Sequence, residues 1–545
     1  MMGPRRRPAP FRTTLLGLAV VVAAWLATAA SAQDSAEYGN ASGGLTLWSR
    51  GDRAALSEIV VEAKRPLSAA SSEDIRARDF ELRPHDTITQ VLNDVPELVV
   101  AQHQGGAKAA QYLIRGFDSD HGTDFAIFVD GVPVNLVSHA HGQGYSDLNF
   151  VIPETISRLE LYKGPYFTQF GDFDNAGALD VVTRDEVAEN SFLVEGGSFD
   201  TMRFVPQVSA PAGPGKLYLA GQIYSTNGPF VSPQNLWSYD LFAKYTLEPT
   251  PTSSLRATAY FYDADWDASG QIPLRAVKGI YQPNVPPFGA PFTGPRLDPF
   301  GSIDPTEGGR TDKEGVNLQY EASPTPADRV KLQAYGYRYR LRLWSDFTFF
   351  RFTGFRFIRG ANGDVIDTGD APVVPGASYI PGDEIEQDDE RCTFGFKGRW
   401  VHSWEPGGLP VQTRLGIENR NDDIENLGLF RAVRRDRFFA VNRLGLWESS
   451  VSGWAENQAF VGKWARLEVG LRGDVYFFHA SNRLPPQPPD PNFESQAIPG
   501  SRTAGIVSPK ANLVITPPRR SGGSTSTASS SSPATRASST RRSTT

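Results

Sequence analysis

Long alternating runs in the second half of the chain most restrict what it can fold into. After residue 191, apolar and polar residues take turns, for example over residues 217–224, 335–343 and 467–477. A period of two predicts β-strands with one apolar and one polar face. Several runs reach the roughly 9–11 residues that a tilted strand needs to cross a bilayer, whereas soluble strands usually have about 5–6. We therefore expect a mainly β chain that forms a transmembrane antiparallel β-barrel.

Composition and motif content remove several other classes of protein. The formal net charge of −7 over 545 residues gives no support for a nucleic-acid partner. The single Cys392 excludes an intramolecular disulfide and any multi-cysteine metal site. The sequence has no nucleophile elbow, no H-E-x-x-H motif and no Walker loop. We therefore predict no catalytic residues and no cofactor.

The N-terminal sequence is typical of an exported protein. Three arginines at positions 5–7 precede a short apolar run, and Ala-Ser-Ala at 30–32 has the small-residue pattern of a cleavage site. We expect residues 1–32 to be a cleaved signal peptide and the small, polar residues 33–56 to be a flexible periplasmic segment. Because no second apolar run is long enough for a helical span, a membrane-spanning form must be a closed barrel.

Four short motifs between residues 113 and 184 each combine an apolar run with Gly, Pro or Asp. Such runs predict strands that enter tight turns. In order and spacing, the four motifs resemble the plug domain of TonB-dependent outer-membrane receptors. They are LIRGF (113–117), FVDGVPV (128–134), ISRLELYKGP (156–165) and NAGALDVVTR (175–184).

The resemblance implies a small α+β plug domain inside the barrel. We expect the plug at residues 64–188 and the barrel at residues 189–516. Within the plug, residues 87–94 predict a helix with Asp86 as its N-cap, and Asp130-Gly131 predicts the turn of a hairpin.

The predicted barrel has fewer strands than the family implies. The family has roughly twenty-two strands, within the range of membrane barrels, whereas about thirteen candidate strands fit before residue 517. Residues 263–310 and 345–390, rich in Gly, Pro and Asp, predict long extracellular loops. Residues 517–545 are an aberrant, low-complexity stretch. They suit either a disordered tail or, as we favour, a C-terminus that is truncated or frameshifted.

A short β-prone strand precedes the plug motifs at residues 57–63. It resembles a TonB box, in which a strand on a flexible tether pairs with the edge of a partner sheet. The resemblance assigns the interaction with TonB to Glu58, Ile59, Val60 and Val61. The alternative is an ordinary first strand of the plug.

Histidines gather in the plug, and they are the most chemically suggestive group in the chain. His139 and His141 lie two residues apart, and His121 lies close to several aspartates. Imidazoles with carboxylates suit Zn(II), Cu(II) or Ni(II). These three histidines are therefore candidate metal ligands. The alternative is polar loop residues that hydrogen-bond inside a wet barrel.

Arg338, Arg340 and Arg342 form the second candidate site. They alternate with apolar residues on one predicted strand, so we expect them to share the face that lines the lumen. There they could attract an anionic ligand such as a ferric siderophore. The alternatives are ion pairs with plug or neighbouring-strand carboxylates, and contacts with lipopolysaccharide near the rim.

The resemblance implies a TonB-dependent receptor and transporter in the Gram-negative outer membrane, not an enzyme. Its ligand would be scarce, such as a metal ion, metal chelate or siderophore. Its partners would be the TonB energy-transducing complex, outer-membrane lipid and lipopolysaccharide, and the barrel-assembly machinery. Two alternatives are a non-transporting binding barrel and a non-functional truncated copy. A secreted hydrolase is a third, with little support.

Overall fold

The computed structural model shows a chain built mainly from β-strands. It describes residues 72–80, 83–103, 105–282, 292–293, 296–302, 304–347, 357–359, 365–367, 379–380, 384–462, 464–487 and 498–515. These residues belong to one compact unit, Glu58–Thr545. The predicted signal peptide, the TonB-box-like strand and the low-complexity stretch lie outside the described residues. No helix among the described residues is long and apolar enough to cross a membrane.

The plug, residues 72–183, contains two small sheets. The first has the strand order β1-β7-β8-β5-β6, in which β5 and β8 are parallel, and the second has the order β2-β3-β4. Asp130 and Gly131 both have positive φ and join β5 to β6, as the hairpin prediction required. The elements are β1 (Ser72–Arg76), α2 (Ala77–Phe80), α3 (Ile88–Leu92), β2 (Leu98–Ala101), β3 (Gln111–Ile114), β4 (Phe117–Asp118), β5 (Phe125–Val129), β6 (Val132–Pro133), η1 (Pro153–Thr155), β7 (Ile156–Lys163) and β8 (Gly177–Thr183).

The predicted helix is present but shorter than expected, and its predicted cap is wrong. The helix α3 covers only Ile88–Leu92, and its N-cap is Thr87, which has an extended backbone. Asp86 is one residue too early, and its backbone N–H donates to the Gln90 side chain. The apolar side of the helix is buried as predicted, because burial depends on its spacing rather than on the cap.

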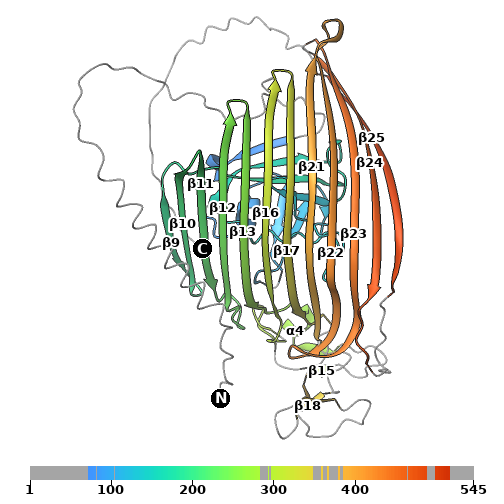
Figure 1. Ribbon diagram of the computed structural model, residues 1–545. Coiled ribbons are helices and arrows are strands. Elements are labelled where there is room, and N and C mark those ends of the chain that lie inside the picture. The colour runs from blue at the N-terminus through green and yellow to red at the C-terminus, as the bar shows by residue number, and fades with distance from the viewer. Residues whose placement is uncertain are drawn as a thin grey trace, which may run out of the picture. The chain divides into compact units, whose positions relative to one another are not determined.

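Twelve antiparallel strands form a single sheet, called the wall below (Figure 1). Each inner strand of the wall pairs with the wall strands before and after it in the chain, and β9 and β25 are its two edges. Among the described residues, the count of wall strands is one below the predicted thirteen. The strands are β9 (Ser191–Gly197), β10 (Thr201–Ala212), β11 (Gly215–Thr226), β12 (Leu236–Thr250), β13 (Ser253–Asp267), β16 (Gly308–Thr325), β17 (Asp328–Ser345), β21 (Glu384–Trp404), β22 (Val411–Val433), β23 (Asp436–Val461), β24 (Ala465–Asn482) and β25 (Gly500–Ile515).

Connections at the two ends of the wall differ in length. The two long ones join β13 to β16 and β17 to β21, in the segments predicted as loops, and lie at the lower end in Figure 1. Short turns such as the one between β16 and β17 lie at the other end. Small elements within the connections are α4 (Leu274–Val277), β14 (Ile280–Gln282), β15 (Phe292–Thr293), β18 (Phe357–Arg359), β19 (Val365–Asp367), β20 (Tyr379–Ile380) and η2 (Pro406–Gly408).

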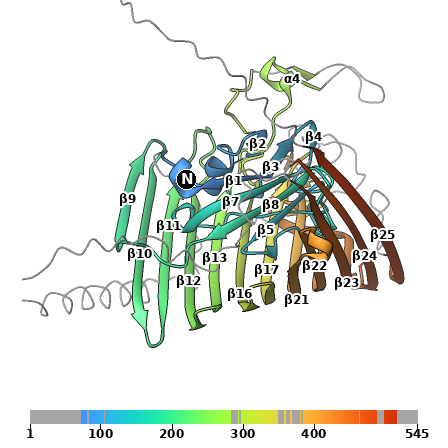
Figure 2. The same cartoon turned by 90° about the horizontal axis from the view of Figure 1, so that it is seen from above.

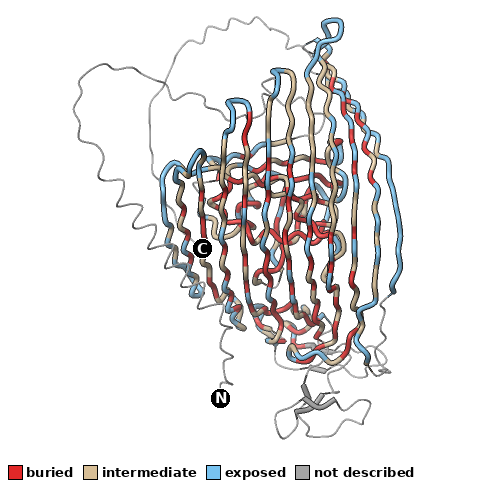
Figure 3. The backbone as a smooth tube through the Cα atoms, in the orientation of Figure 1, coloured by how far each residue is buried: buried red, intermediate tan, exposed pale blue. Residues whose placement is uncertain are grey.

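The plug lies on one side of the curved wall (Figure 2). The largest hydrophobic core joins the two, because aromatic wall residues such as Tyr262, Trp266 and Tyr339 pack into the same cluster as the plug strands. Figure 3 shows buried residues along the plug and the central wall strands, whereas β25 is mostly exposed. The wall therefore presents one face to the plug and the other away from it.

The predicted orientation of β17 is wrong. Tyr335, Tyr337, Tyr339, Leu341 and Leu343 are buried against the plug. The three arginines alternate with them and therefore face away from the plug. The physical reason is that the plug fills the space beside this strand, so the inner face needs apolar and aromatic residues rather than wet, charged ones.

Strand β24 has the orientation that the alternation predicted. Leu467, Val469 and Leu471 are 43–53% exposed on the outer face. Arg472 and Asp474 are buried on the inner face, where Arg472 donates to the plug carbonyl of Gln169. An apolar outer face suits contact with lipid.

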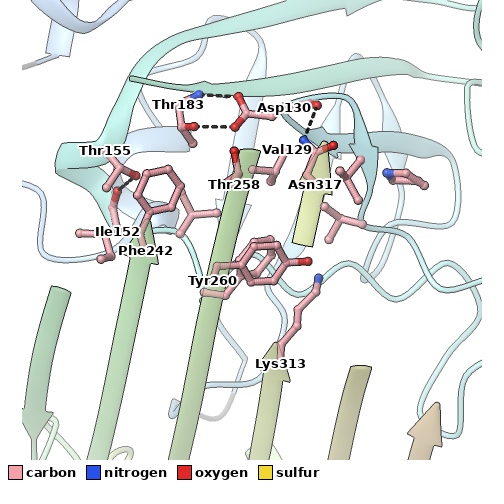
Figure 4. A pocket seen from close by; sticks show the side chains of 15 residues that line it. Val129, Asp130, Ile152, Thr155, Thr183, Phe242, Thr258, Tyr260, Lys313 and Asn317 are labelled. Carbon is pink, nitrogen blue, oxygen red and sulfur yellow. Dashed lines mark hydrogen bonds between the residues drawn. The ribbon is translucent and has the colours of Figure 1, made fainter. Parts of the chain in front are cut away.

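Asp130 connects the tip of the plug hairpin to the wall (Figure 4). Its carboxylate accepts hydrogen bonds from the Thr183 backbone N–H and hydroxyl, at 2.9 and 2.5 Å. Lys244 on β12 places its ammonium 3.1 Å from the same carboxylate. The Asp130 carbonyl accepts from side-chain amides of β16 and β17, namely those of Asn317, Gln319 and Gln333. Asp130 and Asn317 line a cavity (Figure 4), and its volume of about 20 Å³ is enough for one water.

Loss of the Lys244 ammonium should weaken the link between plug and wall. Lys244→Met leaves the buried Asp130 carboxylate without its cation, so we expect a loss of about 3 kcal/mol in unfolding free energy. The matched control is Lys216→Met, because Lys216 forms an exposed pair with Glu186, and such pairs contribute under about 1 kcal/mol. Unfolding of the detergent-solubilised chain gives both values. Equal losses would contradict a structural role for the Lys244 pair.

Candidate functional site

Two of the three predicted histidines meet where the plug borders the wall. The Nε2 atoms of His121 and His141 lie 3.1 Å apart, although the residues are 20 positions apart in the chain. His121 is buried and His141 is half-buried. His141 belongs to a loop rather than to a strand, which lets its ring turn toward His121.

Hydrogen-bond partners determine which nitrogen of each ring carries the proton. The Nδ1 of His121 lies 3.2 Å from the Ala110 carbonyl oxygen. The Nδ1 of His141 lies 2.8 Å from Gln387 Oε1, and the Gln387 amide nitrogen donates to the Ala140 carbonyl. Both partners are acceptors, which favours the tautomer with the proton on Nδ1 in each ring. In that tautomer each Nε2 keeps a lone pair.

Two adjacent nitrogen lone pairs of this kind provide some, but not all, of the ligands of a metal site. Metal-binding imidazoles usually donate their other N–H to a carbonyl or similar oxygen, as both rings do in this structure. A proton between the nitrogens would require one cationic ring. Burial lowers the pKa of His121 to about 4 and that of His141 well below its usual range, and the nearby Lys108 ammonium lowers both further. Both rings are therefore neutral at pH 7, which is the form that binds metal ions.

A carboxylate stands beside the pair. Asp120 Oδ1 lies 3.5 Å from His121 Nε2, and its side chain is 58% exposed. In the described part of the chain, no three His, Cys, Asp or Glu side chains are already arranged to hold a metal ion. The two nitrogens and Asp120 are thus fewer ligands than a closed zinc site has.

The third predicted histidine, His139, has a different environment. Its ring stacks on Tyr145 with centroids 4.1 Å apart. Its Nδ1 accepts from the His141 backbone N–H, so the proton is on Nε2, which lies 3.8 Å from Asp389 without a hydrogen bond. Burial and the nearby Arg391 guanidinium hold the pKa of His139 well below its usual range. His139 orients the loop and does not share the His121–His141 site.

The predicted arginine site has no contact with this histidine pair. Arg338, Arg340 and Arg342 form ion pairs on the outer face with Glu390, Asp312 and Glu386. The three arginines therefore fit the alternative of ion pairs with neighbouring-strand carboxylates. They do not line a lumen as predicted. Sequence reasoning missed Gln387, which no motif marks. The predicted TonB-interacting residues, Glu58 to Val61, lie outside the described residues.

The described residues thus combine a small plug domain with a curved wall of long antiparallel strands, and two histidines meet where they border each other. Residues 65–178 match the model of the TonB-dependent Receptor Plug Domain. These residues are therefore a plug domain of the kind found in TonB-dependent receptors, and the fold of the described chain is similar to that of solved receptors. The similar proteins are named as transporters and import receptors.

Individual proteins are similar to parts of this chain. The vitamin B12 transporter BtuB of Vibrio vulnificus is 29% identical over 229 residues, which are 39% of this chain and 36% of the relative. The ferric citrate transporter FecA has a TM-score of 0.61 at 13% identity, over 82% of this chain and 60% of that one. The copper transporter OprC has a TM-score of 0.54 at 13% identity, over 82% and 61%. The chain thus spans between a third and two thirds of these proteins.

Proposed function

We propose that this chain acts in TonB-dependent uptake of a small, metal-containing ligand across the Gram-negative outer membrane. The observation that supports a metal in the ligand is the position of the His121 and His141 Nε2 atoms, which lie 3.1 Å apart at the boundary of plug and wall. The relatives support the class of activity, since their names include transporters of vitamin B12, ferric citrate and copper.

The proposed route begins with export by a cleaved signal peptide at residues 1–32 and insertion by the barrel-assembly machinery. The apolar outer face of strands such as β24 would contact lipid, and the ion-paired arginines of β17 would lie near lipopolysaccharide. Ligand would bind from the side of the long connections, because Gln387 is only three residues into β21, which follows one of them. Glu58, Ile59, Val60 and Val61 would then recruit the TonB complex.

Uptake can be tested with radiolabelled nickel. Cells that produce the chain should accumulate at least tenfold more nickel than cells without it, and a protonophore should abolish the difference. Nickel is a suitable probe because imidazole binds it well. Accumulation that resists the protonophore would contradict energised uptake. Binding without any accumulation would favour the alternative of a non-transporting barrel or a non-functional copy.

A further inference from the structure

We propose that the wall carries a proton-dependent clamp at its end with the long connections, and that Glu307 is the group that takes up the proton. The closed clamp joins the ends of β13, β16, β17 and β21 to the turn between β22 and β23. This inference goes beyond the proposed function, because the clamp can be measured without ligand and without uptake. The clamp consists of Asp304, Glu307, Asp346, Glu384 and Arg435.

Arg435 connects several of these strand ends. It lies in the turn between β22 and β23 with a positive φ. Its backbone N–H donates to Glu384 Oε2, at the start of β21, over 2.7 Å. Its guanidinium donates to Asp267 Oδ1 at 2.6 Å and to the carbonyl oxygens of Thr306 and Glu307 at 2.6 and 2.9 Å. One side chain therefore contacts the end of β13 and the residues just before β16.

Four carboxyl groups are buried together beside this arginine. The Thr306 hydroxyl lies within hydrogen-bond distance of both Asp304 Oδ1 and Glu384 Oε1. The backbone N–H of Asp346 donates to the Glu307 carboxyl group. Because carboxylates this close repel one another and are shielded from water, they cannot all be ionised. The exposed fractions are 5% for Asp304, 2% for Glu307, 1% for Asp346 and 0% for Glu384.

Glu307 is the member of this group best placed to hold the proton. Its Oε2 atom is buried and has no hydrogen-bond partner among the described residues. A Cβ on Gly270 would lie 2.0 Å from Glu307 Oε1, so the side chain packs directly on the backbone of the neighbouring connection. An ionised carboxylate would be costly in such a place, whereas a protonated one is neutral and can donate to a neighbouring oxygen.

The charges around Glu307 also favour its neutral form. Burial, with a contribution from the carboxylates of Asp304, Asp346 and Glu384, raises the pKa of Glu307 to about 9. Glu307 therefore carries its proton at pH 7.

Cations beside Glu307 are fewer than the carboxylates. The Arg435 guanidinium is shared with Asp267 and with two carbonyl oxygens. On the plug, Lys108 lies near Glu307 and Asp120, but burial lowers its pKa to about 8. These two cations among the described residues cannot neutralise the four buried carboxyl groups and Asp267, so a proton is needed to balance the charge.

Protonation makes the closing of the clamp depend on pH. When the clamp opens, Glu307 reaches water and its pKa returns to the ordinary value of 4.5. Because the pKa is higher in the closed state, the closed state holds one more proton between about pH 4.5 and pH 9. The clamp is therefore most stable in acid, and the ratio of closed to open molecules falls about tenfold for each pH unit in this window. In the proposed orientation this end of the wall faces the external medium, so the clamp would respond to external pH.

Hydrogen exchange of the full chain in detergent tests the clamp. Mass spectrometry would follow the backbone amides of Ala268, Glu307 and Arg435, which donate hydrogen bonds within the clamp or beside it. The rates are corrected for the intrinsic effect of pH on exchange. Between pH 6 and pH 8, the open fraction at these amides should rise about a hundredfold. The same open fraction at both pH values would overturn the inference.

Glu307→Gln identifies the group that holds the proton. Glutamine keeps the shape of the side chain and the acceptor for the Asp346 N–H, but it carries no charge at any pH. At pH 8 the variant should therefore be protected as well as the parent is at pH 6, whereas loss of a merely structural contact would lower protection. The matched control is Glu314→Gln, because Glu314 is an exposed carboxylate of β16, and this variant should keep the parent's pH dependence. The same pH dependence in Glu307→Gln as in the parent would overturn the inference.

Calcium distinguishes a proton from a metal ion at the clamp. Carboxylate oxygens also bind calcium, so the exchange at pH 8 is repeated with millimolar calcium, and the open fraction should not change. Protection by calcium that equals the protection at pH 6 would overturn the inference. None of these measurements involves nickel. Failure of energised uptake would therefore leave the clamp intact, and failure of the clamp would leave uptake intact.

Discussion

Val60→Pro should abolish energised nickel accumulation while surface binding stays at the parent level. Proline has no backbone N–H and cannot donate to a partner strand. Capture by strand pairing depends on such main-chain hydrogen bonds. Accumulation should therefore fall at least tenfold, to the level of protonophore-treated cells. Radiolabelled nickel measures both quantities, as binding to cells on ice and as energy-dependent uptake at growth temperature.

The matched control for this prediction is Val60→Thr. Threonine keeps the backbone N–H and the preference for extended structure, so accumulation should remain near the parent level. Normal accumulation in Val60→Pro would mean that residues 57–63 are an ordinary strand, which is the alternative interpretation of this segment. A loss in both variants would point to the side chain and would equally contradict strand pairing.

Tyr339→Arg should strongly destabilise the interface between plug and wall. Tyr339 is 1% exposed, and its ring lies 5.8 Å from that of His139. An arginine at this position would place a longer, charged side chain in the filled hydrophobic core, so we expect a loss of more than about 4 kcal/mol. The midpoint of thermal unfolding, followed by the heat-dependent shift in gel migration, should fall accordingly.

The adjacent residue is the control for Tyr339. Arg340 points the other way, and its side chain is 47% exposed in a pair with Asp312. Arg340→Gln should therefore cost under about 1 kcal/mol. A larger loss for Arg340→Gln than for Tyr339→Arg would restore the orientation first expected from the alternation, with the arginines inside.

Much of the architecture could be predicted from short, local patterns in the sequence. A period of two marks a strand wherever the strand lies, so runs such as residues 467–477 correspond to β24. Asp130-Gly131 marks a turn because its positive φ angles are a local demand on the backbone. The resemblance to the receptors likewise rested on short motifs, and residues 65–178 match the plug model.

The direction in which a strand faces is a different kind of information. Alternation shows that β17 and β24 each have two unlike faces, but not which face meets the plug. Both strands read alike in sequence, yet the plug covers the aromatic face of β17 and the charged face of β24. The choice depends on what fills the space beside each strand, and that comes from residues some 200 to 300 positions away.

For the histidine site too, one part could be predicted from the sequence and another part required the tertiary structure. The residue types in the plug were enough to predict imidazoles and carboxylates that suit a metal, because residue type sets ligand chemistry. Tertiary structure alone paired His141 with His121 rather than with His139, and it brought Ala110 and Gln387 to their Nδ1 atoms. A nitrogen lone pair is free to bind a metal only where the other nitrogen of the ring donates to an acceptor, and one such acceptor, Gln387, reaches its ring only after the plug has packed against the wall.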